Sequence, residues 1–189
     1  MTTIYLIRHG ETDWNTAGKV QGLTDIPLNI NGEQQAQKSS MYFENKAIDV
    51  ILCSPLLRAR RTAEIINAQL GIQLIEMQEF AERCYGDAEG LTIDERTAKF
   101  GSGIIPNLES REDLQNRVIK GMNQIVNEFE NQKILVVAHG AVINAILYIL
   151  SKGEIGSGIT RLKNACISCI GYKNNSWDII SVNEDAHLQ

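Results

Sequence analysis

Short apolar runs alternate with amphipathic segments along the chain. Compact runs rich in β-branched and aromatic residues predict buried strands at residues 4–7, 49–53, 72–75 and 133–138. The segments between and after them predict helices at residues 32–45, 54–71, 110–129 and 141–150. A closing hairpin is expected from residues 164–172 and 177–182, around Asn174 and Asn175. This order predicts an α/β three-layer sandwich, with a mostly parallel central sheet and helices on both faces.

Two stretches between these elements lack a regular period. Residues 11–31 contain Gly18, Gly22 and Pro27 and predict a long loop, a kind of segment that usually binds something in a compact domain. The later irregular stretch, residues 79–108, predicts a loop followed by a small cap or lid. We expect this cap to cover a site at the carboxyl ends of the strands.

The helix after the second strand has recognisable ends. Ser54 is the expected N-cap, with Pro55 at the first helical position, and Gly71 is a matching stop. Arg58 falls in the first turn, where the helix dipole disfavours a cation, and Arg61 follows one turn later. This misfit predicts an anion nearby, and a solvated basic helix face is the alternative.

Composition and charge limit the classes of protein to which the chain can belong. The 189 residues, 43% hydrophobic and 22% charged, suit one globular domain spanning residues 1–189. A formal charge of −5 with interspersed signs predicts no nucleic-acid or membrane surface. With no leader or spanning segment, a cytoplasmic protein is expected. Cys166 and Cys169 are interpreted as half-buried thiols because no second pair stands at zinc spacing.

Two histidines follow predicted strands directly. His9 ends the first strand, just after Arg8, and His139 ends the strand at residues 133–138. Because the carboxyl ends of parallel strands lie along one edge of a sheet, the two imidazoles are expected to meet across one pocket. A metal site made of His with Asp or Glu is the weaker alternative, because no H-x-x-x-H or comparable spacing occurs. His187 is expected to be an exposed tail residue.

These residue types together permit phosphoryl transfer without a metal. The planar donor forks of Arg8 and Arg58 suit phosphate oxygens, and a neutral His9 can attack phosphorus as a covalent nucleophile. His139, at the start of a buried helix, would add a donor and a favourable dipole. Glu82, among polar and aromatic neighbours that can raise its pKa, is the candidate general acid for the leaving oxygen.

Motifs spread along nearly the whole chain resemble those of the histidine phosphatase superfamily, which includes cofactor-dependent phosphoglycerate mutases and broad acid-type phosphatases. The segments that carry the resemblance are residues 6–12 with Asn15, residues 21–32, residues 54–63, residues 82–90, residues 109–118 and residues 136–140. The resemblance implies that His9 is the phosphohistidine nucleophile and Glu82 the proton donor, with Arg8, Arg58 and His139 holding the phosphoryl group. It also implies a phosphate- or substrate-binding set made of Gly10, Asn15, Gln21, Gly22, Arg83, Tyr85 and Gly140.

The branch of the family is harder to assign. Arg83 and Tyr85 resemble the mutase residues that hold phosphoglycerate, which would imply a 2,3-bisphosphoglycerate primer as cofactor. The short segment after Leu91 lacks the lysine-rich insert and later arginine pair of the mutases, and a phosphatase must admit water. We therefore expect a metal-independent phosphomonoester hydrolase acting on small phosphorylated metabolites, with no cofactor. A mutase and a non-catalytic phospho-ligand-binding protein are the alternatives.

Overall fold

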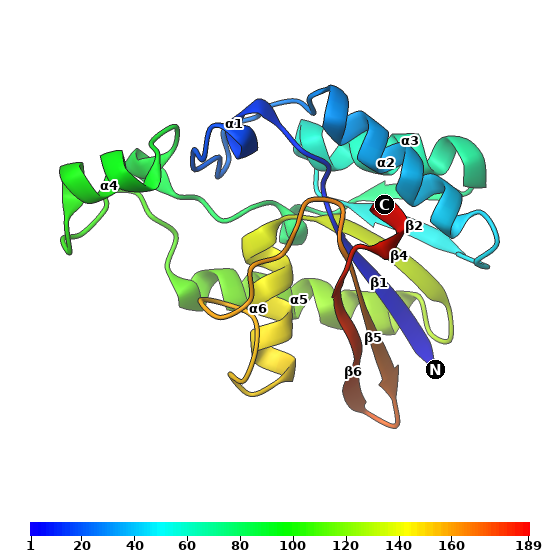
Figure 1. Cartoon of the computed structure of the whole chain (residues 1–189). Helices are drawn as coiled ribbons and strands as arrows, with labels where there is room; N and C mark the ends of the chain where they lie inside the picture. Colours follow the sequence, from blue (N-terminus) through cyan, green and yellow to red (C-terminus); the bar gives the residue numbers. More distant parts are fainter.

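A six-stranded sheet organises the structure, a computed structural model that describes residues 1–189 (Figure 1). Its strands are β1 (Thr2–Arg8), β2 (Val50–Cys53), β3 (Gln73–Glu76), β4 (Lys133–Ala138), β5 (Ile167–Lys173) and β6 (Ser176–Glu184). They run in the order β3-β2-β4-β1-β5-β6. The first four strands in this order are mutually parallel, whereas β5 pairs antiparallel with both β1 and β6.

Helices cover both faces of this sheet. The helices are α1 (Asp13–Thr16), α2 (Ile30–Phe43), α3 (Leu57–Leu70), α4 (Ile93–Phe100), α5 (Arg111–Glu128) and α6 (Gly140–Leu150). The pair α2 and α3 lies on one face, and α5 and α6 lie on the other (Figure 1). The predicted three-layer sandwich is therefore confirmed.

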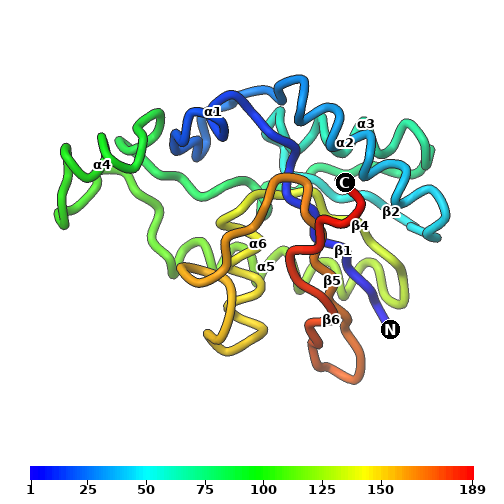
Figure 2. The backbone as a smooth tube through the Cα atoms, viewed as in Figure 1, coloured from blue at the N-terminus to red at the C-terminus, as the bar shows by residue number.

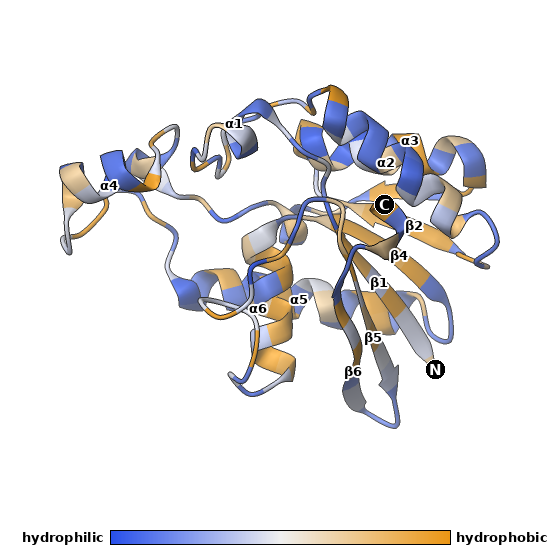
Figure 3. Ribbon diagram, viewed as in Figure 1, coloured by the Kyte–Doolittle hydropathy of each residue, from blue (hydrophilic) through white to orange (hydrophobic).

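Strand β4 shows why its apolar run suits the centre of the sheet. Val136 packs into the core formed with α5 and α6, whereas Leu135 and Val137 pack into the core formed with α2 and α3. Successive side chains of a strand point to opposite faces, so a strand covered on both faces is apolar at every position. Figure 3 shows the hydrophobic colour concentrated in the sheet and on the helix faces turned toward it.

The ends of α3 agree only in part with prediction. Gly71 closes the helix in the left-handed conformation at φ 63°, as expected of a glycine stop. The predicted N-cap is wrong, because α3 begins at Leu57 with Leu56 at the cap and no side-chain cap bond. The Ser54 hydroxyl accepts a bond from Leu56 N at 3.2 Å and lies 2.7 Å from a ring nitrogen of His139.

The segment predicted as a cap contains a helix that the sequence pattern did not indicate. Helix α4 starts at Thr92, whose hydroxyl and backbone N–H form a reciprocal capping box with Glu95. None of its eight residues is buried, and so short a segment does not stand out in the sequence pattern. Figures 1 and 2 show α4 projecting from the main body on two extended connections. One backbone bridge, between Lys19 and Thr92, links the cap to the loop after α1.

Three smaller expectations have clear outcomes. The hairpin turn is confirmed, because Asn174 and Asn175 both adopt positive φ, as a two-residue turn requires. Cys166 and Cys169 are buried thiols, not half-buried ones, because Cys169 lies on β5 inside the sheet and Cys166 directly precedes that strand. His187 is not an exposed tail residue. It is partly buried, 3.3 Å from the Ser39 hydroxyl, because the last residues fold back onto α2.

No helix of the structure is sufficiently long and apolar to cross a membrane.

Candidate active site

His9 and His139 meet at one edge of the sheet. Strands β1 and β4 are paired in parallel with Arg8 opposite Ala138, so the residue after each strand is a histidine. The backbone N–H of His9 donates to the Ala138 carbonyl at 3.0 Å, which continues the ladder by one residue. The two imidazole rings lie 5.2 Å apart between centroids, and both side chains are buried. The expected juxtaposition of the two histidines is therefore present.

The hydrogen bond of His9 determines which ring nitrogen is free. Nδ1 lies 2.6 Å from the Gly10 carbonyl oxygen, and a carbonyl can only accept, so Nδ1 carries the proton. Nε2 then has a free lone pair. Burial, with the positive charges of Arg8 and Arg58, holds the pKa of His9 well below its ordinary value of 6.5. The ring is therefore neutral near neutral pH and has the form that a nucleophile needs.

His139 is oriented by Ser54, a residue that the sequence pattern predicted as a helix N-cap. Its Nε2 is 2.7 Å from the Ser54 hydroxyl, whereas its buried Nδ1 has no protein partner. Ser54 follows β2, which neighbours β4, so its side chain reaches the ring across adjacent strand ends. No local pattern indicated this bond, because it depends on the order of strands in the sheet.

The basic cluster of α3 divides into one buried and two exposed arginines. Arg58 is fully buried and donates to the carbonyl oxygens of Gly22, at 2.7 Å, and Thr24, at 3.1 Å. Arg60 and Arg61 are exposed and form surface ion pairs with glutamates. The solvated-face interpretation therefore holds for these two arginines, and the anion-site interpretation is confined to Arg58.

Three buried nitrogens around the histidines have no hydrogen-bond partner in the protein. They are Arg8 Nε, Arg58 Nε and His139 Nδ1. An unpaired buried polar group is costly, and native proteins rarely retain one without a functional reason. The two guanidinium donors fit an anionic ligand with several acceptor oxygens, and His139 Nδ1 can join them when the Ser54 hydroxyl donates to Nε2. A phosphoryl group has this chemistry.

Glu82 is buried beside the same strand ends. Its carboxylate accepts from the backbone N–H of Arg83 at 2.9 Å and of Ala141, in the first turn of α6, at 3.4 Å. Burial raises its pKa above the ordinary 4.5, although these two bonds and the nearby Arg58 oppose the shift. A carboxyl group with a raised pKa can hold a proton for transfer.

Arg117 fixes the loop that carries Glu82. Its guanidinium donates to the carbonyl oxygens of Glu79 (2.8 Å), Ala81 (2.7 Å) and Glu82 (3.1 Å). It also binds the Glu109 carboxylate through Nε at 2.6 Å and Nη2 at 3.0 Å. Five donated bonds from one side chain leave the loop little freedom, so the backbone at Glu82 has a defined position.

The predicted ligands Gln21 and Gly22 lie on the long loop beside Arg58. Gln21 is buried, and its side-chain oxygen has no protein partner. Gly22 adopts φ 58°, and a β-carbon there would collide with the Glu89 carboxylate. Glu89 accepts bonds from the backbone N–H groups of Leu23, Thr24 and Tyr85, so it joins this loop to the Glu82 loop.

Asn15 and Gly10 have structural contacts that the sequence did not reveal. The side-chain oxygen of Asn15 accepts from Thr12 and from the Asn164 amide at 3.1 Å. Asn164 also donates to the carbonyl oxygens of His9 and Gly10, and so supports the His9 loop from the far end of the chain. A β-carbon on Gly10 would strike the backbone of Gly32. Nothing in the local sequence marked Asn164 as part of the site.

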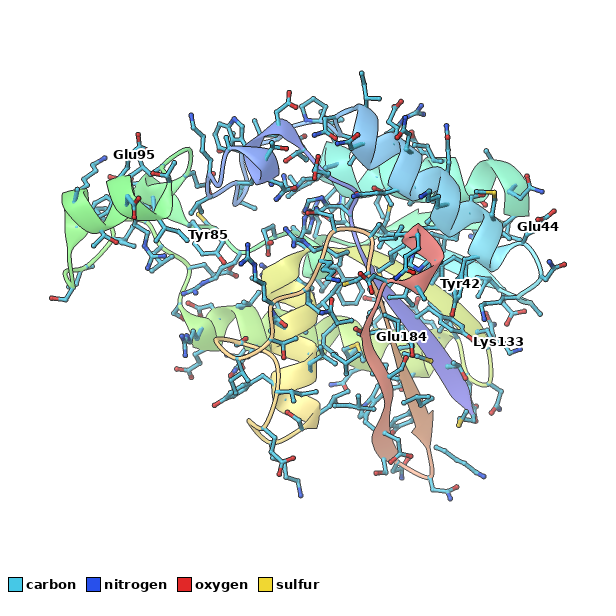
Figure 4. The ribbon with its side chains drawn as sticks, in the orientation of Figure 1. Tyr42, Glu44, Tyr85, Glu95, Lys133 and Glu184 are labelled. Atoms are coloured by element: carbon cyan, nitrogen blue, oxygen red, sulfur yellow. The ribbon has the colours of Figure 1, made fainter.

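A cavity of about 490 Å³ opens beside this centre, between the main body and the cap. Arg8 and Gly140 lie where the cavity meets the histidine pair, and the predicted substrate residues Arg83 and Tyr85 also line it. Figure 4 shows Tyr85 between the cap, which carries Glu95, and the main body. Arg83 donates twice to the Glu109 carbonyl, and its guanidinium lies 5.5 Å from the Tyr85 ring centre.

Comparison with known proteins agrees with this fold. The family described as the histidine phosphatase superfamily (branch 1) matches residues 4–185. The chain therefore belongs to the histidine phosphatase superfamily, as its motifs predicted.

Individual relatives extend over the whole chain. The chain is 47% identical to the uncharacterized phosphatase PhoE of Bacillus subtilis (strain 168) over 188 residues, covering 100% of this chain and 97% of PhoE. The solved structure of Bacillus stearothermophilus YhfR superposes with a TM-score of 0.92 at 26% identity, with complete coverage of both chains. A phosphoserine phosphatase mutant from Entamoeba histolytica, solved in complex with phosphoserine, gives a TM-score of 0.85 at 29% identity, also with complete coverage of both.

Proposed function

We propose that the protein hydrolyses phosphomonoesters of small metabolites through a phosphohistidine on His9. The observation that carries this proposal is the bond from His9 Nδ1 to the Gly10 carbonyl, which leaves Nε2 as a neutral nucleophile among unpaired cationic donors. A pocket that only binds phosphate needs the donors but does not need a free imidazole lone pair. The similarity to PhoE and to a phosphoserine phosphatase also supports hydrolysis.

In the first step of this mechanism, His9 Nε2 attacks phosphorus in line with the ester oxygen. The N–P bond forms as the P–O bond breaks, and the Glu82 carboxyl proton passes to the leaving oxygen. Arg8, Arg58 and His139 stabilise the charge on the three equatorial oxygens. The alcohol product then leaves through the cavity that meets the centre at Arg8 and Gly140.

In the second step, a water molecule attacks the phosphohistidine from the side that the alcohol has left. Glu82, now a carboxylate, accepts a proton from this water as the O–P bond forms and the N–P bond breaks. Inorganic phosphate leaves, and His9 returns to its neutral form. Both steps draw their positive charge from side chains, so we propose that the reaction needs no metal ion.

Trapping the intermediate tests this mechanism directly. Brief incubation with a labelled phosphomonoester and rapid alkaline denaturation should yield an acid-labile, alkali-stable phosphoryl label on His9. Phosphate release should continue in EDTA. His9→Ala should remove both the label and the turnover, and His187→Ala, a change of the same type away from the site, should keep both. Full turnover in His9→Ala, or loss of wild-type turnover in EDTA, would overturn the proposal.

A mutase is the second candidate, and the positions of Arg83 and Tyr85 in the cavity favour it. In a mutase the phosphoryl group returns to a second substrate hydroxyl, so water must be excluded while the phosphohistidine persists. Helix α4 of the cap has no buried residue, which favours access of water. Interconversion of phosphoglycerates that depends on a bisphosphoglycerate primer, faster than phosphate release, would establish the mutase instead. Binding without phosphate release would indicate a non-catalytic protein.

A further inference from the structure

The charge lining the cavity exceeds what one phosphate needs. Five arginines line it: Arg8, Arg83, Arg96, Arg111 and Arg161. No aspartate or glutamate is among the lining residues, although the chain as a whole carries a formal charge of −5. The cavity is therefore a local region of positive charge on an acidic protein, and such a region attracts anions.

Three of these arginines have no assigned partner. Arg96, Arg111 and Arg161 form no ion pair with a carboxylate, whereas Arg60, Arg61 and Arg117 do. Arg83 is different, because it already donates two bonds to the Glu109 carbonyl. Like charges gathered around one cavity repel each other, and a bound anion would relieve that repulsion.

Arg161 stands on a loop that is held in place at three successive carbonyl groups. The carbonyl of Thr160 accepts from Asn144 at 3.0 Å, that of Arg161 from Asn183 at 3.3 Å, and that of Leu162 from Arg8 at 2.6 Å. The last bond joins this loop directly to the arginine beside His9. Burial lowers the pKa of Arg8, and the nearby charge of Arg161 contributes in the same direction. The backbone at Arg161 is thus fixed relative to Arg8, and its exposed side chain lies at the cavity.

Arg111 and Arg96 approach the cavity from two other elements. Arg111 is the first residue of α5, where the partial positive charge of the helix end makes a cation unfavourable and an anion favourable. Its neighbours Glu112 and Asp113 do not line the cavity, and Asp113 accepts a bond from the Ser110 hydroxyl at 2.7 Å. Arg96 comes from α4, the cap helix. The three arginines therefore converge from the main body, the cap and the loop at Arg161.

We propose that Arg111 and Arg161, assisted by Arg96, bind a second negatively charged group of the substrate, a carboxylate or a second phosphoryl group remote from the phosphate that is transferred. This assignment of a substrate class rests on the proposed function. A cavity of about 490 Å³ falls within the range that encloses drug-sized ligands, so it has room for an organic group larger than glycerate. Preferred substrates are thus elongated phosphomonoesters with an anion at the far end.

Matched substrates separate this second site from the reaction itself. The three substrates are hexyl phosphate, the same chain with a terminal carboxylate, and the same chain with a terminal second phosphate. We expect kcat/KM to be at least about tenfold higher for one or both of the doubly anionic substrates than for hexyl phosphate. The carboxylate and phosphate substrates tell the two possible groups apart. Arg161→Gln and Arg111→Gln should each reduce that preference, and the double variant should abolish it.

The control removes one positive charge elsewhere. Lys173→Gln, on an exposed residue of the β5–β6 hairpin, should leave both the activity and the preference unchanged. Equal kcat/KM for all three substrates, or a preference that survives in the double variant, would overturn the second anion site while leaving the proposed hydrolysis intact. Absence of phosphate release from every substrate would overturn the proposed function, and this inference with it.

Discussion

The imidazole rings of His9 and His139 lie 5.2 Å apart, tilted by 56°, because they follow neighbouring strands in matching register. Neither ring depends on a flexible loop for its approach to the other. The backbone of His9 is bonded to Ala138, and the ring of His139 is held by the Ser54 hydroxyl. Three adjacent strand ends, those of β1, β4 and β2, thus set the geometry of the pair, and the contribution of Ser54 can be tested separately.

Ser54→Ala should lower kcat about tenfold, because His139 loses the bond that orients its ring and a small displacement weakens its contact with the phosphoryl group. Removal of the hydroxyl leaves His139 Nε2 buried without a partner, so the free energy of unfolding should fall by about 1–2 kcal/mol. Phosphate release and urea unfolding measure the two effects. Ser54→Thr, which keeps a hydroxyl, should recover most of the rate.

Ser39→Ala is the matched control for this substitution. Ser39 is also fully buried, and its hydroxyl donates to the Gln35 carbonyl at 3.0 Å on α2, away from the histidine pair. Its loss should reduce stability by a similar amount without changing kcat. If Ser54→Ala and Ser39→Ala had the same kcat as the wild type, Ser54 would have no positioning role.

The pH dependence of the reaction should reflect opposite shifts in two pKa values. His9 must be neutral to attack, and its pKa is held below 6.5 by burial and by the charges of Arg8 and Arg58. Glu82 must be protonated to donate, and burial raises its pKa above 4.5. The value of kcat/KM should therefore rise with pH through the lowered pKa of His9 and fall through the raised pKa of Glu82. A bell-shaped profile with an acidic maximum is expected.

The Glu82→Gln variant tests whether Glu82 causes the fall in kcat/KM at higher pH. With an alkyl phosphate, whose leaving group needs a proton, the maximal rate should fall by about a hundredfold to ten-thousandfold. The remaining activity should no longer decline as pH rises through the range where Glu82 loses its proton. A glutamine variant that retained the wild-type alkaline limb would assign that limb to another residue.

Local patterns in the sequence were sufficient to predict the strands of the sheet and the meeting of the two histidines at its edge. A strand covered on both faces is apolar along its length, and a histidine directly after such a strand lies at the carboxyl edge of the parallel strands whatever the exact strand order. The helix stop at Gly71 and the hairpin turn at the two asparagines were also predictable from local sequence, because positive φ restricts the residue type. Each of these features depends on only a few neighbouring residues.

Features that depend on strand order or on distant contacts were missed. Ser54 supports His139 only because β2 neighbours β4, and Asn164 reaches His9 only because β5 pairs with β1. The cap helix was missed for a different reason. Helix α4 is only eight residues long and buries none of them, so its short pattern did not stand out, and its main mark was the capping box from Thr92 to Glu95.

Arg117→Met should affect the proton donor more than the nucleophile. Without Arg117, the carbonyl groups of Glu79, Ala81 and Glu82 lose their donor, and the Glu109 carboxylate loses its counter-charge. The free energy of unfolding should fall by about 2 kcal/mol, since the Arg117 and Glu109 side chains are only partly exposed. The rate should fall for an alkyl phosphate and change little for p-nitrophenyl phosphate, whose leaving group needs no proton.

Arg60→Met removes an arginine whose ion pairs with Glu64 and Glu76 lie on the surface, so it controls for loss of charge alone. This substitution should lower the free energy of unfolding by less than about 1 kcal/mol and leave the rates with both substrates unchanged. An Arg117→Met variant with equal losses on the two substrates would mean that the Glu82 loop keeps its position without this side chain.

Gly22→Ala and Gly18→Ala separate backbone strain from collision on the long loop. Both glycines have positive φ, 58° at Gly22 and 65° at Gly18. The strain of an alanine at either position should lower the free energy of unfolding by about 1 kcal/mol. A β-carbon at Gly18 meets open space, whereas at Gly22 it meets Glu89, which binds Leu23 and Thr24. Gly22→Ala should therefore cost about 3 kcal/mol in urea unfolding. It should also raise KM for phosphomonoesters, because the Gly22 carbonyl that holds Arg58 must move. Equal stabilities and equal KM values for the two variants would show that Glu89 yields to the added methyl group and that Arg58 keeps its position.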